Sequence, residues 1–395
     1  MNVKTGLDFI RDNVEIVSRK YQGNIGYLCH SASIDSNLRH GIEIIKDVFG
    51  DRLTKLFSPQ HGIVSDVQDN MVETNHSTHP YFKLPIYSLY SETRKPTDKM
   101  LENLDVVFID LQDVGTRIYT YIYTMTLFME ACQDKDIKVV ILDRPNPING
   151  VDMEGNLLED EFTSFVGRHP LPVRHAMTMG EIALMAKRDW GHDCDLEVIE
   201  MQNWKREMSF EETGLPWVMP SPNLPTIEAA YTFVGTVIFE GTNISEGRGT
   251  TRSLEIIGHP KLEAFTHQEV INSMLNKYGL KGFSLRPLSF LPTFQKHAGV
   301  ACGGYQVHIT DRKLAQPWKL CMVLTKYFYQ VLGADFKWKQ DQYEYVVGKN
   351  PFDIINGSAK LRSWIENDGS YEQLLEIEAN GQSRYIESRS KNLLY

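Results

Sequence analysis

The first half of the chain alternates short apolar runs with segments of helical periodicity, and this alternation restricts the possible folds more than any other feature. Residues 105–110 form a near-continuous apolar run, and residues 138–142 form another, as expected for strands that are buried on both faces. A helical pattern over residues 119–133 separates them. Strands that alternate with helices in this way predict a parallel, Rossmann-like sheet with helices on both sides.

The pattern changes after a proline-rich stretch at residues 220–225. Beyond it, strands are expected at 233–239 and 303–310, and helices at 316–332 and 358–366. This second region has the mixed order of an α+β unit. We therefore expect an α/β protein in which a Rossmann-like lobe, residues 1–228, is followed by a smaller α+β C-terminal lobe, residues 229–395.

Five short clusters of polar residues, each with glycine, proline or asparagine, come at the ends of apolar runs. They lie at residues 57–62, 110–117, 142–147, 220–225 and 239–251. In open α/β sheets the ligand crevice lies outside the carboxyl ends of the strands, so the clusters predict one shared site. In particular, the side chains of Asp113, Arg144, Asn223 and Glu246 should line a single cavity.

The segment 239–251 is the richest of these clusters. It combines two carboxylates, an amide, an arginine, three glycines and four hydroxyl side chains, and it follows the run expected to be a strand. A surface turn is the simplest alternative, but an ordinary turn does not need these charged groups together. The segment therefore indicates a site that orients a polar ligand.

Composition excludes several classes of function. The net charge is −10, and the 41 Lys and Arg residues form no long run, which argues against nucleic acid and anionic membranes as partners. No apolar stretch reaches the roughly 18 residues of a transmembrane helix, and the N-terminus has no signal-peptide pattern, so a cytoplasmic location is expected. The five cysteines contain no CxxC pair and are expected to be reduced and mostly buried.

No cofactor is expected. A GxGxxG motif does not follow the first strand, so the sequence does not indicate a dinucleotide. His61, His76 and His79 lie on one long loop, residues 58–84, but they lack the close spacing with carboxylates that metal sites show. We therefore predict that the protein has no essential metal.

Six motifs follow one another along the chain: SPQHG (58–62), DLQDVGTRIYTYIYTM (110–125), LDRPNPING (142–150), PVRHAMTMGE (172–181), PSPNLP (220–225) and FEGTNISEGRGTT (239–251). In this order they resemble the NamZ family of exo-β-N-acetylmuramidases, long known as a domain of unknown function. The resemblance extends from about residue 23 to the C-terminus. It implies a glycoside hydrolase that removes N-acetylmuramic acid from the non-reducing end of peptidoglycan fragments, a role in cell wall turnover.

The resemblance also directs attention to position 60. The family pattern reads PEHG at this loop, with its glutamate as the leading catalytic candidate, whereas this chain has Gln60. Glutamine cannot donate or accept a proton at neutral pH, and glycoside hydrolysis normally needs two carboxyl groups. We therefore predict that Glu73, on the same loop, replaces the missing acid and acts with Asp113 and Glu246 as the catalytic set.

Recognition of the substrate should involve arginine, because muramic acid carries a lactyl carboxylate and a planar guanidinium binds carboxylates in a bidentate manner. Arg117, Arg144 and Arg248 fall at expected strand ends, although each could instead form an internal ion pair. The other substrate-binding candidates are Ser58, Gln60, His61, Tyr119, Asn223, Glu240 and Asn243.

Two other functions remain open at this point. Gln60 is compatible with a non-catalytic binder of muropeptides or of a related acidic sugar. A hydrolase of another linkage on the same scaffold is a further alternative. Turnover of a chromogenic β-N-acetylmuramide separates the enzyme from the binder.

Overall fold

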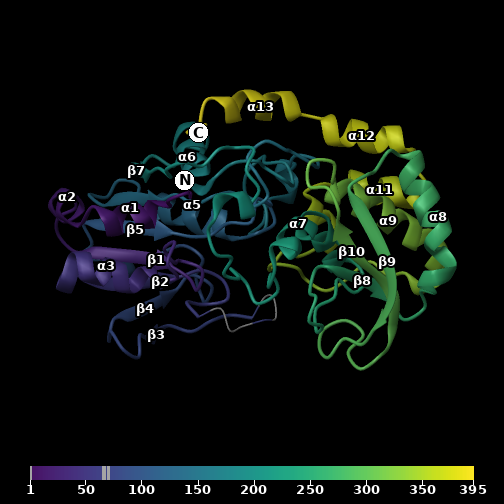
Figure 1. Cartoon of the computed structure of the whole chain (residues 1–395), viewed down its shortest axis with the longest axis horizontal. Coiled ribbons are helices and arrows are strands. Elements are labelled where there is room, and N and C mark those ends of the chain that lie inside the picture. The colour runs from purple at the N-terminus through teal and green to yellow at the C-terminus, as the bar shows by residue number, and fades with distance from the viewer. Residues whose placement is uncertain (1, 65–67, 69–71) are drawn as a thin grey trace.

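The computed structural model describes residues 2–64, 68 and 72–395. The chain forms two lobes that lie side by side, one built mainly from the N-terminal half and the other mainly from the C-terminal half (Figure 1). Strand-rich layers lie inside both lobes, and helices cover them. This arrangement is the one expected from the sequence: a large, mostly parallel sheet in the first lobe and a smaller α+β second lobe.

The first lobe is built on a seven-stranded sheet with the order β3-β4-β2-β1-β5-β6-β7. All neighbouring pairs are parallel except β3 and β4, which pair antiparallel at one edge. From β4 to β7 this is the strand order of the doubly wound fold, whose direction reverses between β1 and β5. The strands are β1 (Ile25–Cys29), β2 (Leu53–Ser58), β3 (Ser77–Thr78), β4 (Pro85–Ser88), β5 (Val106–Asp110), β6 (Lys138–Leu142) and β7 (Asp195–Ile199).

Helices cover both faces of this sheet. Phe108 of β5 packs with side chains of α1 and α3, whereas Val107 and Ile109 pack with the cluster that contains α5 and α6. This alternation follows from the two-residue period of a strand, which sends successive side chains to opposite faces. The helices of this lobe are α1 (Gly6–Asp12), α2 (Val14–Lys20), α3 (Gly41–Phe49), α4 (Asp98–Leu101), α5 (Tyr121–Ala131) and α6 (Met179–Asp189), with 3-10 turns η1 (Gly50–Arg52), η2 (Asp160–Phe162) and η3 (Glu211–Thr213).

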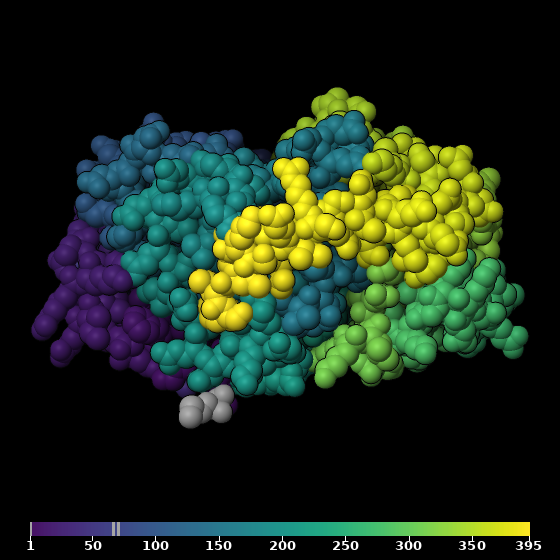
Figure 2. Space-filling view, turned by 90° about the horizontal axis from the view of Figure 1, so that it is seen from above, coloured from purple at the N-terminus to yellow at the C-terminus, as the bar shows by residue number. Residues whose placement is uncertain are grey.

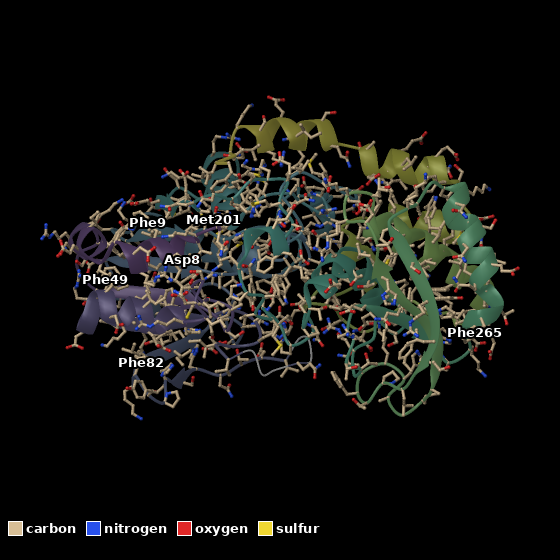
Figure 3. The ribbon with its side chains drawn as sticks, in the orientation of Figure 1. Asp8, Phe9, Phe49, Phe82, Met201 and Phe265 are labelled. Atoms are coloured by element: carbon tan, nitrogen blue, oxygen red, sulfur yellow. The ribbon has the colours of Figure 1, made fainter. Side chains whose placement is uncertain are left out.

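The second lobe contains a three-stranded antiparallel sheet with the order β8-β10-β9. Helix α8 carries Phe265 on the outer side of this lobe, where its ring is exposed, while Phe49 of α3 is buried in the first lobe (Figure 3). The elements are β8 (Ile256–His259), β9 (Phe283–Phe290), β10 (Cys302–Ile309), α7 (Ile227–Thr236), α8 (Ala264–Lys277), α9 (Pro317–Leu332), α10 (Pro351–Asn356), α11 (Lys360–Glu366), η4 (Val237–Gly241) and η5 (Gly333–Asp335).

The strand expected at residues 233–239 is wrong. These residues belong to helix α7 and to the 3-10 turn η4 that follows it. Thr226 caps α7 by accepting a hydrogen bond from the amide of Ala229, and nearly every side chain of the helix is buried. A helix that is buried on all sides has the same continuous apolar run as a buried strand, so periodicity does not separate the two. The predicted lobe boundary at residue 228 falls in the first turn of α7, and the division into domains stays a prediction.

The C-terminal segment runs back from the second lobe over the first. It contains α12 (Tyr371–Ala379) and α13 (Gln382–Ser390), which lie across the junction of the two lobes in Figure 2. The Tyr385 hydroxyl donates to the carbonyl of His175 at 2.6 Å, and the Tyr395 hydroxyl donates to Asp143 at 2.8 Å. One hydrophobic cluster also continues from the first lobe into the second. The C-terminal segment and this shared core hold the two lobes together.

The cysteines agree with the sequence-based expectation, since all five are buried and none forms a disulfide. Within the described ranges, the longest apolar helices are still too short or too polar to cross a membrane.

Candidate active site

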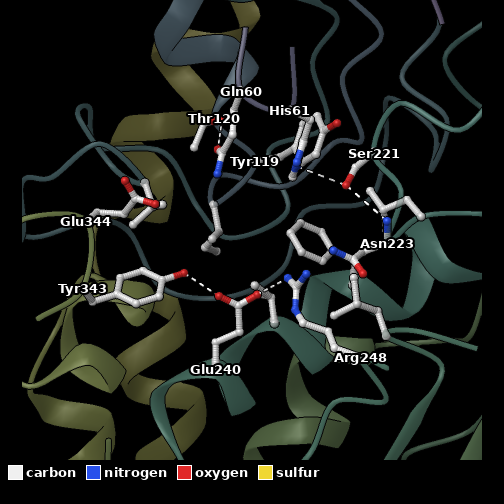
Figure 4. A pocket seen from close by; sticks show the side chains of 16 residues that line it. Gln60, His61, Tyr119, Thr120, Ser221, Asn223, Glu240, Arg248, Tyr343 and Glu344 are labelled. Atoms are coloured by element: carbon white, nitrogen blue, oxygen red, sulfur yellow. Dashed lines mark hydrogen bonds and ion pairs between the residues drawn. The ribbon is translucent and has the colours of Figure 1, made fainter. Parts of the chain in front are cut away.

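A cleft lies between the two lobes and contains about 490 Å³ of space free of atoms, including the part open to solvent. Ligand sites are typically concave and carry few, well-placed polar groups. Both lobes line the cleft (Figure 4). The first lobe and the proline-rich stretch 220–225 contribute Gln60, His61, Ile118, Tyr119, Thr120, Val166, Ser221, Asn223 and Leu224, and the second lobe contributes Phe233, Val237, Glu240, Arg248, Leu254, Tyr343 and Glu344.

The loop after β2 supplies the polar groups of the first-lobe wall. The backbone turns sharply there, because His61 and Gly62 both have left-handed φ angles, of 71° and 75°. The Thr120 hydroxyl donates to Oε1 of Gln60 at 2.8 Å, so the amide nitrogen of Gln60 faces the cleft (Figure 4). Nε2 of His61 lies 3.2 Å from the Ser221 hydroxyl. Among the described residues this wall carries no carboxylate, lysine or arginine, and we call it the neutral wall.

The facing wall of the second lobe is charged. Glu240 lies in η4, and its carboxylate forms an ion pair with Arg248 and accepts a hydrogen bond of 2.6 Å from the Tyr343 hydroxyl. Burial opposes ionisation, but the charge of Arg248 and the bond from Tyr343 more than compensate, and the pKa of Glu240 lies below its usual range. Glu240 is therefore an anion at neutral pH, although only 5% of its surface is exposed.

Close packing of the backbone fixes the position of Glu240. A Cβ atom at the neighbouring Gly241 would lie 2.4 Å from the Cα atom of Phe352, so α10 can approach η4 only because residue 241 is glycine. Larger side chains at 241 would push η4 away and displace the carboxylate. Gly241 of the 239–251 motif is therefore required by close packing.

Glu344 is a second buried carboxyl group in the cleft. Its residue is 6% exposed, and the Tyr90 hydroxyl donates to its two oxygens at 3.1 and 3.3 Å. Burial raises its pKa to about 7, an effect that the Tyr90 bond and the charge of Arg94 reduce and that the charge of Glu240 adds to. Glu240 and Glu344 therefore differ in protonation tendency within one site, which is how enzymes separate a base from an acid.

Six of the predicted site residues lie in the cleft: Gln60, His61, Tyr119, Asn223, Glu240 and Arg248. The expectation that Asp113, Arg144, Asn223 and Glu246 line one cavity is wrong, because only Asn223 does. Asp113 instead accepts hydrogen bonds from the Gly115 amide at 2.7 Å and pairs with His175 at 3.2 Å, which closes the turn after β5.

The predicted carboxylate-binding arginines also have internal partners. Arg144 binds Asp110 with both Nε and Nη2, at 2.5 and 2.9 Å. Arg117 is fully buried, and its strongest bonds go to the carbonyls of Asn156 and Leu171 at 2.8 Å and of Asn356 at 2.6 Å. Its guanidinium therefore joins backbone segments far apart in the sequence and is not available to a substrate.

Glu246 belongs to the charge network behind Glu240 and does not face the cleft. It lies 3.2 Å from Arg248, and Nζ of Lys296 donates to it at 2.7 Å. Lys296 also donates to the carbonyls of Phe239 and Ile244. Glu246 and Lys296 thus hold Arg248 and η4 in place.

The remaining predicted residues lie outside the cleft. Glu73 is half exposed, accepts a hydrogen bond of 3.0 Å from the Tyr345 hydroxyl and lies 3.5 Å from Arg94. Asn243 binds the backbone of Asp335 and Lys337, and Ser58 is a buried residue of β2. The catalytic role of Glu73 stays a prediction, but Glu73 is not among the residues that line the cleft.

Tyr343 and Glu344 line the cleft although no sequence pattern predicted them. They lie in an irregular segment between η5 and α10, without the apolar run or glycine cluster that marked the other site residues. The only local sign is the sequence Tyr-Glu-Tyr at 343–345, in which a carboxyl group stands between two aromatic rings.

The structure also shows where the loop histidines lie. His61 is in the cleft, His76 lies 3.1 Å from Glu92, and His79 accepts hydrogen bonds from the backbone of its own turn. Across the described part of the chain, no group of three or more His, Cys, Asp and Glu side chains is arranged to hold a metal ion.

A doubly wound lobe, an α+β lobe and a cleft with two buried glutamates between them define a two-lobed α/β protein with a site at the junction of its lobes. The family models described as exo-β-N-acetylmuramidase NamZ, N-terminal and C-terminal, match residues 25–228 and 231–395. The chain therefore belongs to the exo-β-N-acetylmuramidase NamZ family, as its motifs indicated.

Individual relatives agree with this assignment. The chain is 38% identical to peptidoglycan β-N-acetylmuramidase NamZ of Bacillus subtilis over 394 residues, which cover 100% of this chain and 91% of the relative. Crystal structures of two DUF1343 family proteins from Bacteroides fragilis also match. Their TM-scores are 0.88 and 0.75 at 29% and 27% identity, and both alignments cover 100% of this chain and 99% of the other.

Proposed function

We propose that this chain is an exo-acting glycoside hydrolase that releases N-acetylmuramic acid from the non-reducing end of peptidoglycan fragments. Two lines of support come from outside the site: membership of the NamZ family and full-length similarity to a peptidoglycan β-N-acetylmuramidase. The single observation in the site that carries the proposal is Glu240, a buried carboxylate that Arg248 and Tyr343 keep ionised in the cleft.

An ionised carboxylate is what glycoside hydrolysis requires on one side of the reacting bond. The transition state resembles an oxocarbenium ion, and a carboxylate either stabilises it as nucleophile or activates the attacking water. We assign this role to Glu240. Tyr343 and Arg248 hold the carboxylate at a fixed position, so that little reorganisation is needed when positive charge develops on the sugar.

The neutral wall is suited to hold the sugar. The Gln60 amide nitrogen, the His61 ring and the Asn223 amide supply hydrogen-bonding groups, and the Tyr119 ring adds an aromatic surface. Among the three arginines predicted to bind the lactyl carboxylate, Arg248 is the one whose residue lines the cleft. We therefore assign recognition of that carboxylate to Arg248, beside its structural role.

The test is hydrolysis by the purified chain. It should release N-acetylmuramic acid from a disaccharide of N-acetylmuramic acid β-linked to N-acetylglucosamine, and it should cleave a chromogenic β-N-acetylmuramide. The matched substrate is the chromogenic β-N-acetylglucosaminide, which lacks only the lactyl group and should react far more slowly. No release from either muramide would overturn the proposal.

A second candidate function rests on Gln60. Because an amide stands where the family pattern has a carboxyl group, the chain could bind muropeptides without cleaving them. Saturable binding of N-acetylmuramic acid without turnover of the disaccharide would support this binder. Turnover at a rate above that of the Glu240→Gln variant would exclude it.

We also propose that the fragments are taken from cell wall turnover and reach the protein in the cytoplasm. Support comes from the five free, buried cysteines, which are typical of a reducing compartment. Fractionation of the native cells with an antibody against the chain tests the location. Recovery outside the cytoplasmic membrane would overturn it.

A further inference from the structure

Gln60 leaves the proposed reaction without an obvious proton donor. Hydrolysis of a sugar–sugar bond needs an acid that protonates the departing oxygen, because an alkoxide is a poor leaving group. Glu240 is held as an anion by its partners, and Gln60 has no exchangeable acid proton at neutral pH. Another group in the cleft must therefore supply the proton.

Glu344 is the remaining carboxyl group among the described residues that line the cleft. Glu344, Gln60, Thr120 and Glu240 all line this cleft, and Figure 4 shows their side chains around it. Glu344 therefore offers a carboxyl group in the same cleft that Gln60 lines. The position is fixed by Tyr90, whose hydroxyl donates to Glu344 at 3.1 Å from the β4 side of the first lobe.

We propose that Glu344 is the proton donor of this enzyme and replaces the acid that is missing at position 60. This inference rests on the proposed hydrolase function and identifies the acid of the same site. In the reaction, the bond between C1 and the leaving oxygen breaks as the Glu344 proton moves to that oxygen, and the aglycone leaves as an alcohol. One water supplies the hydroxyl that ends on C1 and the proton that restores Glu344, so the balance closes with one water consumed.

The charged and titratable groups that face Glu344 are consistent with this role. Burial raises its pKa to about 7, the Tyr90 hydroxyl and Arg94 lower it, and Glu240 raises it further. An acid with a pKa near the working pH is both protonated often enough and acidic enough to transfer its proton. The kcat/KM of the wild type should therefore fall as the pH rises through about 7.

Arg94 and Tyr90 position this acid. The Arg94 guanidinium lies 3.8 Å from the centre of the Tyr90 ring, and Tyr90 in turn holds Glu344. Because the Tyr90 hydroxyl stabilises the ionised form of Glu344, its removal should raise the pKa of that carboxyl. In Tyr90→Phe the alkaline limb of kcat/KM should move to higher pH, an effect that a purely structural role of Tyr90 would not produce.

The main experiment compares Glu344→Gln with the wild type on two substrates. On the disaccharide, kcat/KM should fall by about 10²–10⁴-fold, the usual contribution of a general acid. On the nitrophenyl β-N-acetylmuramide the loss should be at least about tenfold smaller, because a nitrophenolate leaves with little need of a proton. The alkaline limb should also disappear.

Glu154→Gln is the matched control. Glu154 is 2% exposed and burial raises its pKa to about 7 as well, but it lies away from the cleft and bonds to the amide of Lys319. This variant should keep the wild-type kcat/KM on both substrates and keep the alkaline limb. If Glu154→Gln loses as much kcat/KM as Glu344→Gln and also loses the alkaline limb, the effect is not specific to the cleft. That result would overturn the assignment of Glu344.

The outcomes separate this inference from the function on which it rests. If the wild type cleaves the disaccharide and Glu344→Gln cleaves it equally well, the inference fails and the function stands. An equal loss on both substrates, with an unchanged pH profile in Tyr90→Phe, would also overturn it. If the wild type cleaves neither substrate, the proposed function fails and the inference fails with it.

Discussion

The two walls of the cleft differ in charge. Among the described residues, the first-lobe wall includes Gln60, His61, Tyr119 and Thr120 and carries no carboxyl group, whereas the second-lobe wall carries Glu240, Glu344 and Arg248. In the proposed function the two lobes therefore have different tasks. The Rossmann-like lobe contacts the sugar through groups that are not carboxylates, and the smaller lobe supplies the proton donor, the anion and the arginine assigned to the lactyl carboxylate. Substitutions on the charged wall should therefore cost far more activity than substitutions on the neutral wall.

The largest effect is expected for Glu240→Gln. The amide has nearly the same shape but cannot stabilise an oxocarbenium ion or accept a proton, so kcat/KM on the disaccharide should fall by up to about 10⁴-fold. Binding of N-acetylmuramic acid, measured by calorimetry, should persist, because the neutral wall and Arg248 are unchanged. A loss below tenfold would mean that the charged wall does not carry the chemistry.

The next effect concerns stability and the other carboxyl of the charged wall. Burial raises the pKa of Glu344 from its ordinary 4.5 to about 7, so the folded state holds this proton more tightly than the unfolded chain. The wild type should therefore lose stability as the pH rises from about 4.5 to about 7, by about 3 kcal/mol at most. Glu344→Gln has no such titration.

Urea unfolding at about pH 4 and about pH 8 measures this difference. The free energy of unfolding of Glu344→Gln, measured relative to that of the wild type, should rise by about 3 kcal/mol at most between about pH 4 and about pH 8. This rise is independent of any difference in stability between the two proteins at the lower pH. The same comparison for Glu240→Gln should not show a gain, because the pKa of Glu240 is lowered in the fold. Parallel pH curves for wild type and Glu344→Gln would contradict the buried, protonated state of this carboxyl.

A smaller effect is expected on the neutral wall. Gln60→Glu adds a carboxyl group that the Thr120 hydroxyl can still bond, at a place where Glu344 already supplies the proton. The kcat/KM on the disaccharide should change by less than about tenfold, since a second acid adds little to an existing one. Activity that appears only in Gln60→Glu, from an inactive wild type, would instead identify the natural chain as a binder.

The sequence was informative about the first lobe because a parallel sheet imposes simple patterns. Buried central strands such as β5 and β6 give continuous apolar runs, and loops that follow parallel strands meet at one edge of the sheet. Gln60 and His61, directly after β2, were found in this way. At the start of α6, Thr178 and Glu181 have the three-residue spacing of a capping box, and the structure contains this box.

The second lobe was harder to predict for physical reasons. Helix α7 is buried on all sides and has the apolar run of a strand. The partners of a charged side chain depend on tertiary contacts, and sequence does not show that Arg144 pairs with Asp110 or that Arg117 donates to backbone carbonyls. Glu344 reaches the cleft from an irregular segment that no periodic pattern marks.

The smallest effect separates the sequence-based choice of acid, Glu73, from the structural one. The side chain of Glu73 is 48% exposed. It accepts a hydrogen bond from the Tyr345 hydroxyl and lies 3.5 Å from Arg94. Glu73→Gln keeps a hydrogen-bond acceptor for Tyr345 and removes one exposed charge, which is worth little in water. The kcat/KM on the disaccharide should therefore fall only about two- to fivefold, with the alkaline limb of the pH profile retained. Steady-state kinetics across pH measures both quantities, and a Glu73→Gln variant that loses more than about a hundredfold together with its alkaline limb would return the proton-donor role from Glu344 to Glu73.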